Sequence, residues 1–258
     1  MALITIIGRG HSGTRAISQT LHASDVFMGN PLNKSGDLLP PEKLYEACRV
    51  LGQRIRYAGN LEWDFSGLQA NPLPTEFTSL VESYLSSVLQ SKNPNRGWKL
   101  PETTLIYPWI VRMFPDARYI FWVRHPFDSI LGDHLTDDLA GFGVPAPDTE
   151  DLYQRRAVSW LYHHTIQQAF PRPAHFLEVR YEDFVLKQKE TLQRLEDFLR
   201  LKLAVIPVHA ESVNKWDGRL DPEKFTYLYP ALEYHGYVRQ SQGLSTEDQA
   251  TGVSSAGG

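Results

Sequence analysis

The segment 8–15 gathers cations and hydroxyl groups among three glycines and reads Gly-Arg-Gly-His-Ser-Gly-Thr-Arg. The preceding run Leu3–Ile7 is apolar and β-branched, and residues 16–21 continue with helical spacing, so we predict strand, glycine-rich turn and helix. Backbone N–H groups and a helix N-terminus converge at such a turn and favour an anion. The glycines permit positive φ and close approach to the backbone. A tight turn without a ligand is the alternative, and the clustered cations argue against it.

Gly8 and Gly13 have the spacing of a nucleotide-binding phosphate loop. That motif continues with Lys and then Ser or Thr, and its lysine reaches the terminal phosphates. Here Thr14 and Arg15 stand at those two positions. A P-loop nucleotide kinase or NTPase therefore stays as an alternative. The missing lysine counts against it, as does the lack of a convincing acidic metal ligand after the second predicted strand.

Composition limits the class of protein. A chain of 258 residues with 42% hydrophobic and 22% charged residues can bury one substantial α/β core. The net charge of -4 argues against a nucleic-acid partner, so any basic site must be local. Cys48 is the single cysteine, which excludes an internal disulfide and predicts a reducing compartment. Nothing approaches the roughly 20 apolar residues of a membrane span, and we predict a cytoplasmic protein.

Strand-like and helix-like runs alternate along the chain. We predict strands at 3–7, 25–29, 118–123 and 175–180, helices at 41–57, 75–90, 104–114, 149–170 and 187–199, a turn at 92–96, loops at 30–41 and 140–147, and an irregular, substrate-lining segment at 58–74. Such alternation predicts a three-layer α/β fold, a mainly parallel sheet flanked by helices. We expect one domain over residues 1–239 and a disordered tail at 240–258, which has little to bury.

Four motifs follow one another along this framework. They are Ser12-Gly13-Thr14, Trp98-Lys99-Leu100-Pro101, Arg124-His125-Pro126 after the strand introduced by Phe114-Pro115-Asp116-Ala117, and Val179-Arg180-Tyr181-Glu182-Asp183-Phe184. In this order they resemble the sulfotransferases that use 3′-phosphoadenylyl sulfate (PAPS). The resemblance extends over roughly residues 3–237 and includes Lys215-Trp216 and His235-Gly236-Tyr237. It implies a P-loop NTPase-like sulfotransferase fold.

The resemblance also implies an activity and a set of cofactor contacts. A sulfuryl group would pass from PAPS to a hydroxyl or amine of an acceptor, leaving adenosine 3′,5′-bisphosphate. The first loop would hold the 5′-phosphosulfate through the backbone of His11 to Thr14 and the Thr14 hydroxyl. Arg124, at the carboxyl end of a parallel strand, would bind the 3′-phosphate. Its alternative is an ion pair that caps the following helix. The implied cofactor-binding residues are Arg9, Gly10, His11, Ser12, Gly13, Thr14, Arg15, Arg124 and Ser129.

Two positions depart from the pattern of the family. His11 stands where relatives carry Lys or Arg, and it can stabilise an anion only when protonated or as a single neutral donor. Arg9 or Arg15 would then supply the fixed charge. Gly132 stands where relatives carry a serine of the 3′-phosphate site, and Ser129, one helical turn earlier, is predicted to replace it. The departure at His11 keeps a catalytically inactive PAPS-binding protein as a further alternative.

Transfer of the sulfuryl group requires stabilisation of charge on the leaving phosphate and a base for the acceptor proton. We predict His11, Lys99 and Glu102 as catalytic residues. Lys99 follows a predicted strand and would contact the sulfuryl oxygens, with a solvated lysine as the alternative. Glu102 is preferred as base over Asp37 and His134.

The sequence predicts no metal site, since the adjacent His163 and His164 face different directions on a helix. We interpret Tyr181-Glu182-Asp183 as structural. The expected partner is a small-molecule or carbohydrate acceptor, bound by the segments 30–74 and 134–150. The identity of that acceptor and the oligomeric state are left open.

Overall fold

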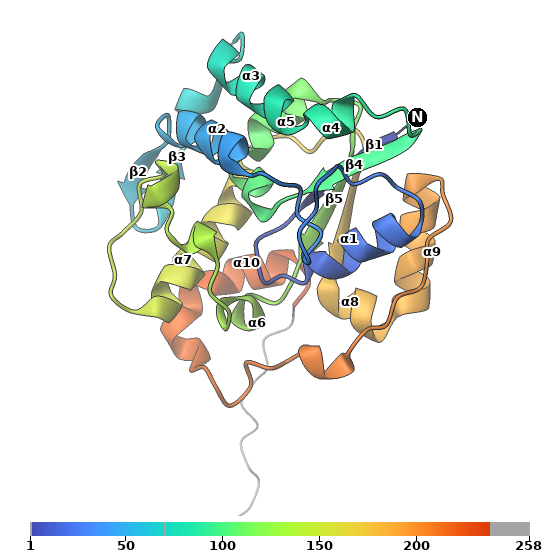
Figure 1. The fold of residues 1–258 in the computed structure, drawn as a ribbon. Helices are drawn as coiled ribbons and strands as arrows, with labels where there is room; N and C mark the ends of the chain where they lie inside the picture. Colours follow the sequence, from blue (N-terminus) through green and yellow to red (C-terminus); the bar gives the residue numbers. More distant parts are fainter. Residues whose placement is uncertain (1, 70, 238–258) are drawn as a thin grey trace, which may run out of the picture.

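The computed structural model describes residues 2–69 and 71–237, and its centre is a four-stranded parallel sheet (Figure 1). The strands are β1 (Ala2–Ile7), β4 (Asn95–Lys99), β5 (Arg118–Val123) and β6 (Phe176–Arg180), in the order β4-β1-β5-β6. β1 therefore pairs on both sides, with Ile6 beside Lys99 and Ile7 beside Phe121. The predicted α/β fold with a mainly parallel sheet is confirmed.

Alternation along the strands supplies two apolar faces, as parallel strands buried on both sides require. Ile4 and Ile6 of β1 and Ile120 and Trp122 of β5 belong to one core cluster. This face is covered by α1 (Thr14–Ala23), α8 (Tyr181–Leu186) and α9 (Gln188–Leu199).

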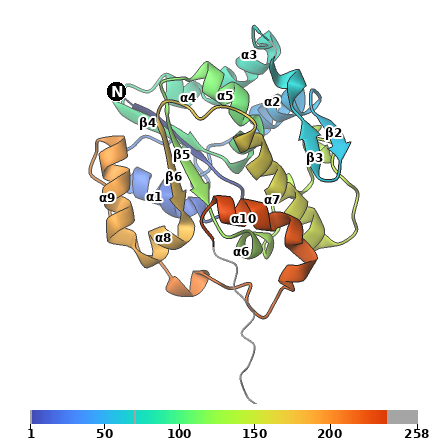
Figure 2. The same ribbon diagram turned by 180° about the vertical axis from the view of Figure 1, so that it is seen from behind.

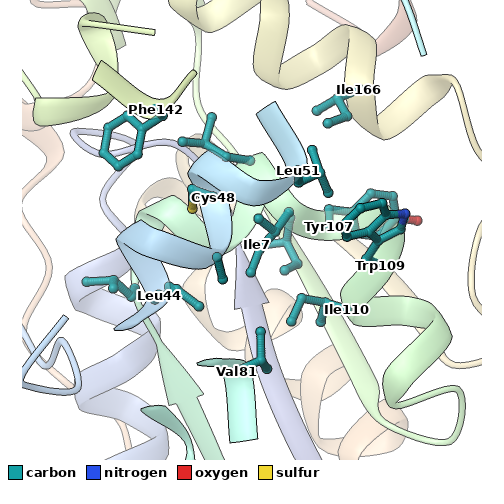
Figure 3. Packing of buried hydrophobic residues seen from close by; sticks show 14 of the residues in the cluster. Ile7, Leu44, Cys48, Leu51, Val81, Tyr107, Trp109, Ile110, Phe142 and Ile166 are labelled. Carbon is teal, nitrogen blue, oxygen red and sulfur yellow. The ribbon is translucent and has the colours of Figure 1, made fainter. Parts of the chain in front are cut away.

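The opposite face carries the larger cluster (Figure 3). Ile7, Trp98 and Phe121 of the sheet pack there against helices and the turns between them. The helices are α2 (Glu42–Gly52), α3 (Thr75–Tyr84), α4 (Ser86–Leu89), α5 (Tyr107–Met113) and α7 (Leu152–Gln168). The two faces together complete the three layers.

A third apolar cluster packs the last described part of the chain, from residue 216 onward, against α6 and α7. Phe127 of α6 (Pro126–Ile130), Trp160 of α7 and Trp216 pack with Leu232 of α10 (Tyr229–Tyr234). Figure 2 shows α10 lying across α7 and α6. Short 3₁₀ turns complete the chain at Ser66–Gln69, Pro101–Ile106, Leu135–Asp137, Ala140–Phe142, Ala210–Ser212 and Pro222–Leu228.

The predicted helix 41–57 and irregular segment 58–74 are wrong in part. The helix ends at Gly52, and β2 (Arg56–Gly59) pairs with β3 (Glu62–Asp64) as a hairpin. Its turn places Gly59, Asn60 and Leu61 at positive φ, which glycine and asparagine tolerate best. Arg56 and Asp64 form an ion pair across the hairpin at 2.6 Å.

Other predicted boundaries also moved. The expected strand 25–29 is reduced to one isolated bridge between Phe27 and Arg96, and β4 begins within the expected turn 92–96. The helix predicted for 104–114 is split into a 3₁₀ turn and α5, because Pro108 has no N–H for the helical ladder. The helix predicted for 75–90 is interrupted at Leu85 between α3 and α4.

The long strand and the two later helices lie close to their predicted positions. The strand at 118–123 coincides with β5, and the helices predicted at 149–170 and 187–199 correspond to α7 and α9. The expected disordered tail 240–258 lies outside the described residues. Within 2–69 and 71–237, no helix is both long and apolar enough to span a bilayer.

Candidate active site

The loop 8–13 connects β1 to α1 at the carboxyl end of the sheet. Gly13 has φ of 79° and His11 φ of 60°, so the chain turns sharply before the helix. The N-terminus of α1 has no side-chain cap. Within the described residues, the N–H groups of His11 and Gly13 have no acceptor, whereas Ser12 N–H donates to the Arg9 carbonyl at 3.2 Å. Uncapped N–H groups at a helix start favour an anion.

This loop forms one wall of a cleft of about 550 Å³. The side chain of Lys99 enters the cleft from the end of β4, and Arg124 enters it from just beyond β5. The opposite wall is the segment 206–209. Of the predicted site residues, the cleft brings together Gly10, His11, Gly13, Thr14, Arg15, Lys99 and Arg124.

Three predicted cofactor-binding residues do not line the cleft. Arg9 is 3% exposed and donates to the carbonyls of Gly10 and Ser129 while forming an ion pair with Asp137. Ser12 is buried, and its carbonyl accepts a hydrogen bond from Trp122 Nε1 at 2.9 Å. Ser129 is fully buried. Arg9 therefore supports the loop from beneath, and Arg15 is the loop arginine that faces the cleft.

Arg124 is held at the cleft by several contacts. Its guanidinium donates to the His11 carbonyl at 3.0 Å and to the Ser212 carbonyl, and it lies 4.8 Å from the centre of the Tyr181 ring. An ion pair at 3.5 Å joins it to Asp128 of α6. Arg124 therefore both forms an ion pair with the following helix, as in the alternative stated above, and lines the cleft. A guanidinium fixed in this way is preorganised for an anion, because its planar fork presents paired donors.

Lys99 is buried and paired, so it is not a solvated lysine. Its Nζ donates to Asp37 Oδ1 at 2.5 Å, and its side chain is 3% exposed. Burial lowers the pKa of Lys99, and the Asp37 carboxylate opposes that shift. Asp37 belongs to the loop 30–41, so this ion pair attaches the loop to the end of β4.

Glu102 lies deeper than Lys99 and is 2% exposed. Burial raises the pKa of Glu102 to about 7. Its Oε1 lies 3.9 Å from Nε2 of His134, which does line the cleft. Thr136 N–H donates to Nδ1 of His134 at 3.3 Å, so the ring proton sits on Nε2, toward Glu102. Burial lowers the pKa of His134 to about 3, which keeps the ring neutral.

His11 of the loop and Arg15 of the first turn of α1 are exposed. Arg15 donates to Ser35 Oγ at 2.9 Å across the cleft. Partial burial and the charge of Arg9 lower the pKa of His11, against opposing contributions from Asp133 and Asp137. The fixed positive charges at the cleft are thus those of Arg15, Lys99 and Arg124.

The sequence interpretation missed three features of the site. Tyr181, interpreted as structural, lines the cleft beneath Arg124 and donates or accepts a hydrogen bond with Ser212 Oγ at 2.7 Å. The wall at 206–209 carries no recognisable motif. Asp137 was also missed. Because Arg9 was expected to contact the cofactor, the sequence interpretation sought no ion-pair partner for it.

The two carboxylates that follow Tyr181 make structural contacts, in line with the interpretation of that segment from the sequence. Glu182 accepts from His125 N–H at 2.9 Å and from the Tyr237 hydroxyl at 2.7 Å, and Asp183 pairs with Arg180. His163 and His164 differ in their contacts, the first with the Ser159 carbonyl and the second with His235. Over the described ranges, no group of three His, Cys, Asp or Glu residues could hold a metal ion.

Comparison with known proteins yields a family and a fold. A model of the Sulfotransferase family matches residues 4–204. The sulfotransferase domain of the olefin synthase from Synechococcus PCC 7002 is similar, with a TM-score of 0.55 and 17% identity, covering 90% of this chain and 94% of that one. Sulfotransferase STF9 from Mycobacterium avium has a TM-score of 0.51 and 12% identity, covering 91% and 77%. No curated protein sequence matches the chain significantly.

The raised pKa of Glu102 has a consequence for stability. In the unfolded chain a glutamate ionises near its ordinary pKa of 4.5, whereas the folded protein retains the proton up to about 7. The folded state therefore binds more protons between these values, and its stability falls as pH rises through them. We expect Glu102→Gln to remove this loss, which amounts to as much as about 3 kcal/mol.

Urea unfolding at pH 4.5 and pH 8 measures this effect. Relative to wild type, Glu102→Gln should gain stability on going to pH 8. The exposed Glu76→Gln is the matched control and should follow wild type. Parallel pH dependence of wild type and Glu102→Gln would contradict the assignment.

Proposed function

Because the chain belongs to the sulfotransferase family, we propose that it transfers a sulfuryl group from PAPS to a hydroxyl or amine of a small-molecule or carbohydrate acceptor. The observation that carries the proposal is the cleft itself. An uncapped helix start, Lys99 and Arg124 face one space of about 550 Å³. Cations on both sides of a glycine-rich loop suit a ligand with more than one anionic group.

The residues present fit the proposed cofactor. The backbone N–H groups of the loop and Thr14 would hold its 5′ side, and Arg124 would bind the 3′-phosphate. The Cβ that a side chain at Gly13 would add lies 2.4 Å from the Tyr181 ring, so the loop can approach this wall only with glycine there. When bound, PAPS supplies the activated sulfuryl group. The polar and apolar lining at 206–209 leaves room for the nucleoside.

Lys99 supports transfer as a buried cation that faces the cleft. Its ammonium group is shielded from bulk solvent, which strengthens its interaction with an anion, while the Asp37 carboxylate offsets part of its charge. Asp37 keeps the group charged and oriented. Asp37 acts as a positioning residue for Lys99 in this proposal.

Glu102 is the proposed proton acceptor. A pKa of about 7 is near the value at which a general base is most effective at neutral pH. One carboxylate oxygen, Oε2, is buried with no hydrogen-bond partner among the described residues. Glu102 does not itself line the cleft, whereas His134, whose Nε2 lies 3.9 Å from Glu102 Oε1, does.

The proposed cofactor can be tested by thermal unfolding. We expect adenosine 3′,5′-bisphosphate at a hundred times its Kd to stabilise the protein by about 2.7 kcal/mol, or roughly 5–10 °C for a chain of this size. ATP with and without Mg²⁺ is the comparison. Stabilisation by Mg²⁺-ATP alone would support the kinase alternative and overturn the proposal.

Arg124→Ala separates the two readings of Arg124. Loss of the guanidinium should weaken binding of adenosine 3′,5′-bisphosphate by about 1.5 kcal/mol or more, which is over tenfold. Titration calorimetry measures the affinity, and the exposed Arg219→Ala is the control. Arg124→Lys should recover only part of the affinity, because lysine lacks the planar fork. Unchanged affinity in folded Arg124→Ala would remove Arg124 from the site.

Glu102→Gln tests the proposed base. We expect kcat to fall by about a hundredfold to ten-thousandfold, while affinity for adenosine 3′,5′-bisphosphate changes little. The wild-type kcat should rise with pH to about 7, the pKa of Glu102, because the ionised carboxylate is the active form. A residual rate in Glu102→Gln with the same rise would assign the base elsewhere. Binding without turnover in wild type would favour the inactive PAPS-binding alternative.

A further inference from the structure

Two glycines, on different loops, each face a histidine ring of the other loop. Gly10 belongs to the loop after β1, and a Cβ added there would lie 1.9 Å from Cδ2 of His134. Gly132 lies between α6 and the turn Leu135–Asp137, and a Cβ added there would lie 2.3 Å from Nδ1 of His11. Neither glycine has positive φ. Their backbone conformations would accept a side chain, and the three atoms nearest each added Cβ belong to an imidazole ring.

The two contacts are reciprocal and act on the same space. The rings of His11 and His134 meet edge to face, with centroids 6.3 Å apart. Both rings line the cleft. Beneath them, Arg9 of the first loop forms an ion pair with Asp137 of the second. The two loops are therefore joined by a buried ion pair and by two histidine–glycine contacts.

The imidazole of His11 packs directly on Gly132, and the ring is also hydrogen-bonded to the backbone of Asp133. The Nδ1, Cγ and Cε1 atoms of the ring are those nearest the position of the added Cβ, at 2.3, 2.6 and 2.8 Å. That part of the ring rests on the glycine backbone. Even the smallest side chain at 132 would have to displace the ring, because a Cβ atom in a protein is essentially never found within 3.0 Å of a non-bonded heavy atom.

We propose that Gly132 is a positioning residue: its missing side chain provides the seat on which His11 is held at the anion-binding end of the cleft. Gly10 provides the corresponding seat for His134. His11 and Gly132 then form a matched pair, and the effect of changing one depends on the other. These two histidine–glycine contacts, His11 with Gly132 and His134 with Gly10, are called the interlock and are present in the protein without any ligand. Its consequence for ligand binding rests on the proposed function.

A double-mutant cycle between His11 and Gly132 tests the pair. The variants are Gly132→Ser, His11→Ala and the double variant, with Gly132→Ala as a smaller change. We expect Gly132→Ser to lower the Tm of the ligand-free protein by several degrees when His11 is present and by less than about 1 °C in the His11→Ala background, as coupled neighbours behave. This readout does not depend on any ligand.

The ligand arm uses adenosine 3′,5′-bisphosphate. Gly132→Ser should weaken its binding about tenfold in the wild-type background and less than about twofold when His11 is absent. Gly141→Ser is the control, because Gly141 also lacks positive φ and the three atoms nearest an added Cβ there belong to the exposed carboxylate of Asp138, which accepts a hydrogen bond from the Gly141 N–H at 3.1 Å.

Additive effects on Tm would overturn the matched pair, as would a wild-type-like Tm for Gly132→Ser. If Gly132→Ser does not fold, recovery of folding in the double variant supports the pair, and failure to recover in both the double variant and His11→Ala/Gly132→Ala rejects it. A wild-type protein that ignores adenosine 3′,5′-bisphosphate would contradict the proposed function. The Tm cycle would still decide on the interlock.

Discussion

The site depends on the position of β1 between two parallel neighbours. Since β1 pairs with β4 and β5, its carboxyl end cannot open toward either edge of the sheet. The loop 8–13 must instead leave the sheet between the end of β4, where Lys99 lies, and the end of β5, where Arg124 follows. Ligands of open parallel sheets gather at this location because the strand ends and helix starts meet there.

Charges around the cleft are paired before any ligand arrives. Lys99 is paired with Asp37, Arg9 with Asp137 and Arg124 with Asp128. A buried charge without a partner would cost several kcal/mol, and removal of one partner is correspondingly destabilising. Two of these pairs do more than neutralise charge, because Lys99–Asp37 and Arg9–Asp137 each connect two segments that are distant in the chain, whereas Arg124–Asp128 spans four residues. The loops of the site are held through them to the rigid sheet.

Much of the fold could be predicted from the sequence, and the reasons lie in particular residues. The apolar run Arg118–Val123 and the glycine-rich segment 8–15 carry strong local patterns, so β5 and the turn between β1 and α1 were predicted at their observed positions. The hairpin β2–β3 was missed because its strands are short and half-exposed, and Asn60 and Leu61 take positive φ. No alternation marks such strands.

The site was predictable as a set of residue types and less so as an arrangement. The cations at 9 and 15 look equivalent in sequence, yet Arg9 points into the protein and Arg15 into the cleft. Their difference arises from Asp137, which is 128 residues away from Arg9 along the chain. The seat of His11 on Gly132 also depends on a contact between distant segments. Local pattern cannot report either contact.

The order of the strands also sets where the two cations of the cleft are anchored. Adjacent strands lie about 4.8 Å apart, and the ends of β4 and β5, which flank β1, are also staggered along the strand direction. Lys99 is paired with Ile6, which is paired with Ile120 on its other side, so Arg124 lies four residues beyond that level. Lys99 and Arg124 are anchored at those two ends and their head groups are held by Asp37 and by backbone carbonyls. The sheet therefore sets where the two residues are anchored, and contacts from the neighbouring loops set where their head groups lie. A single ligand that engages both cations must carry anionic groups whose separation matches that of the two head groups.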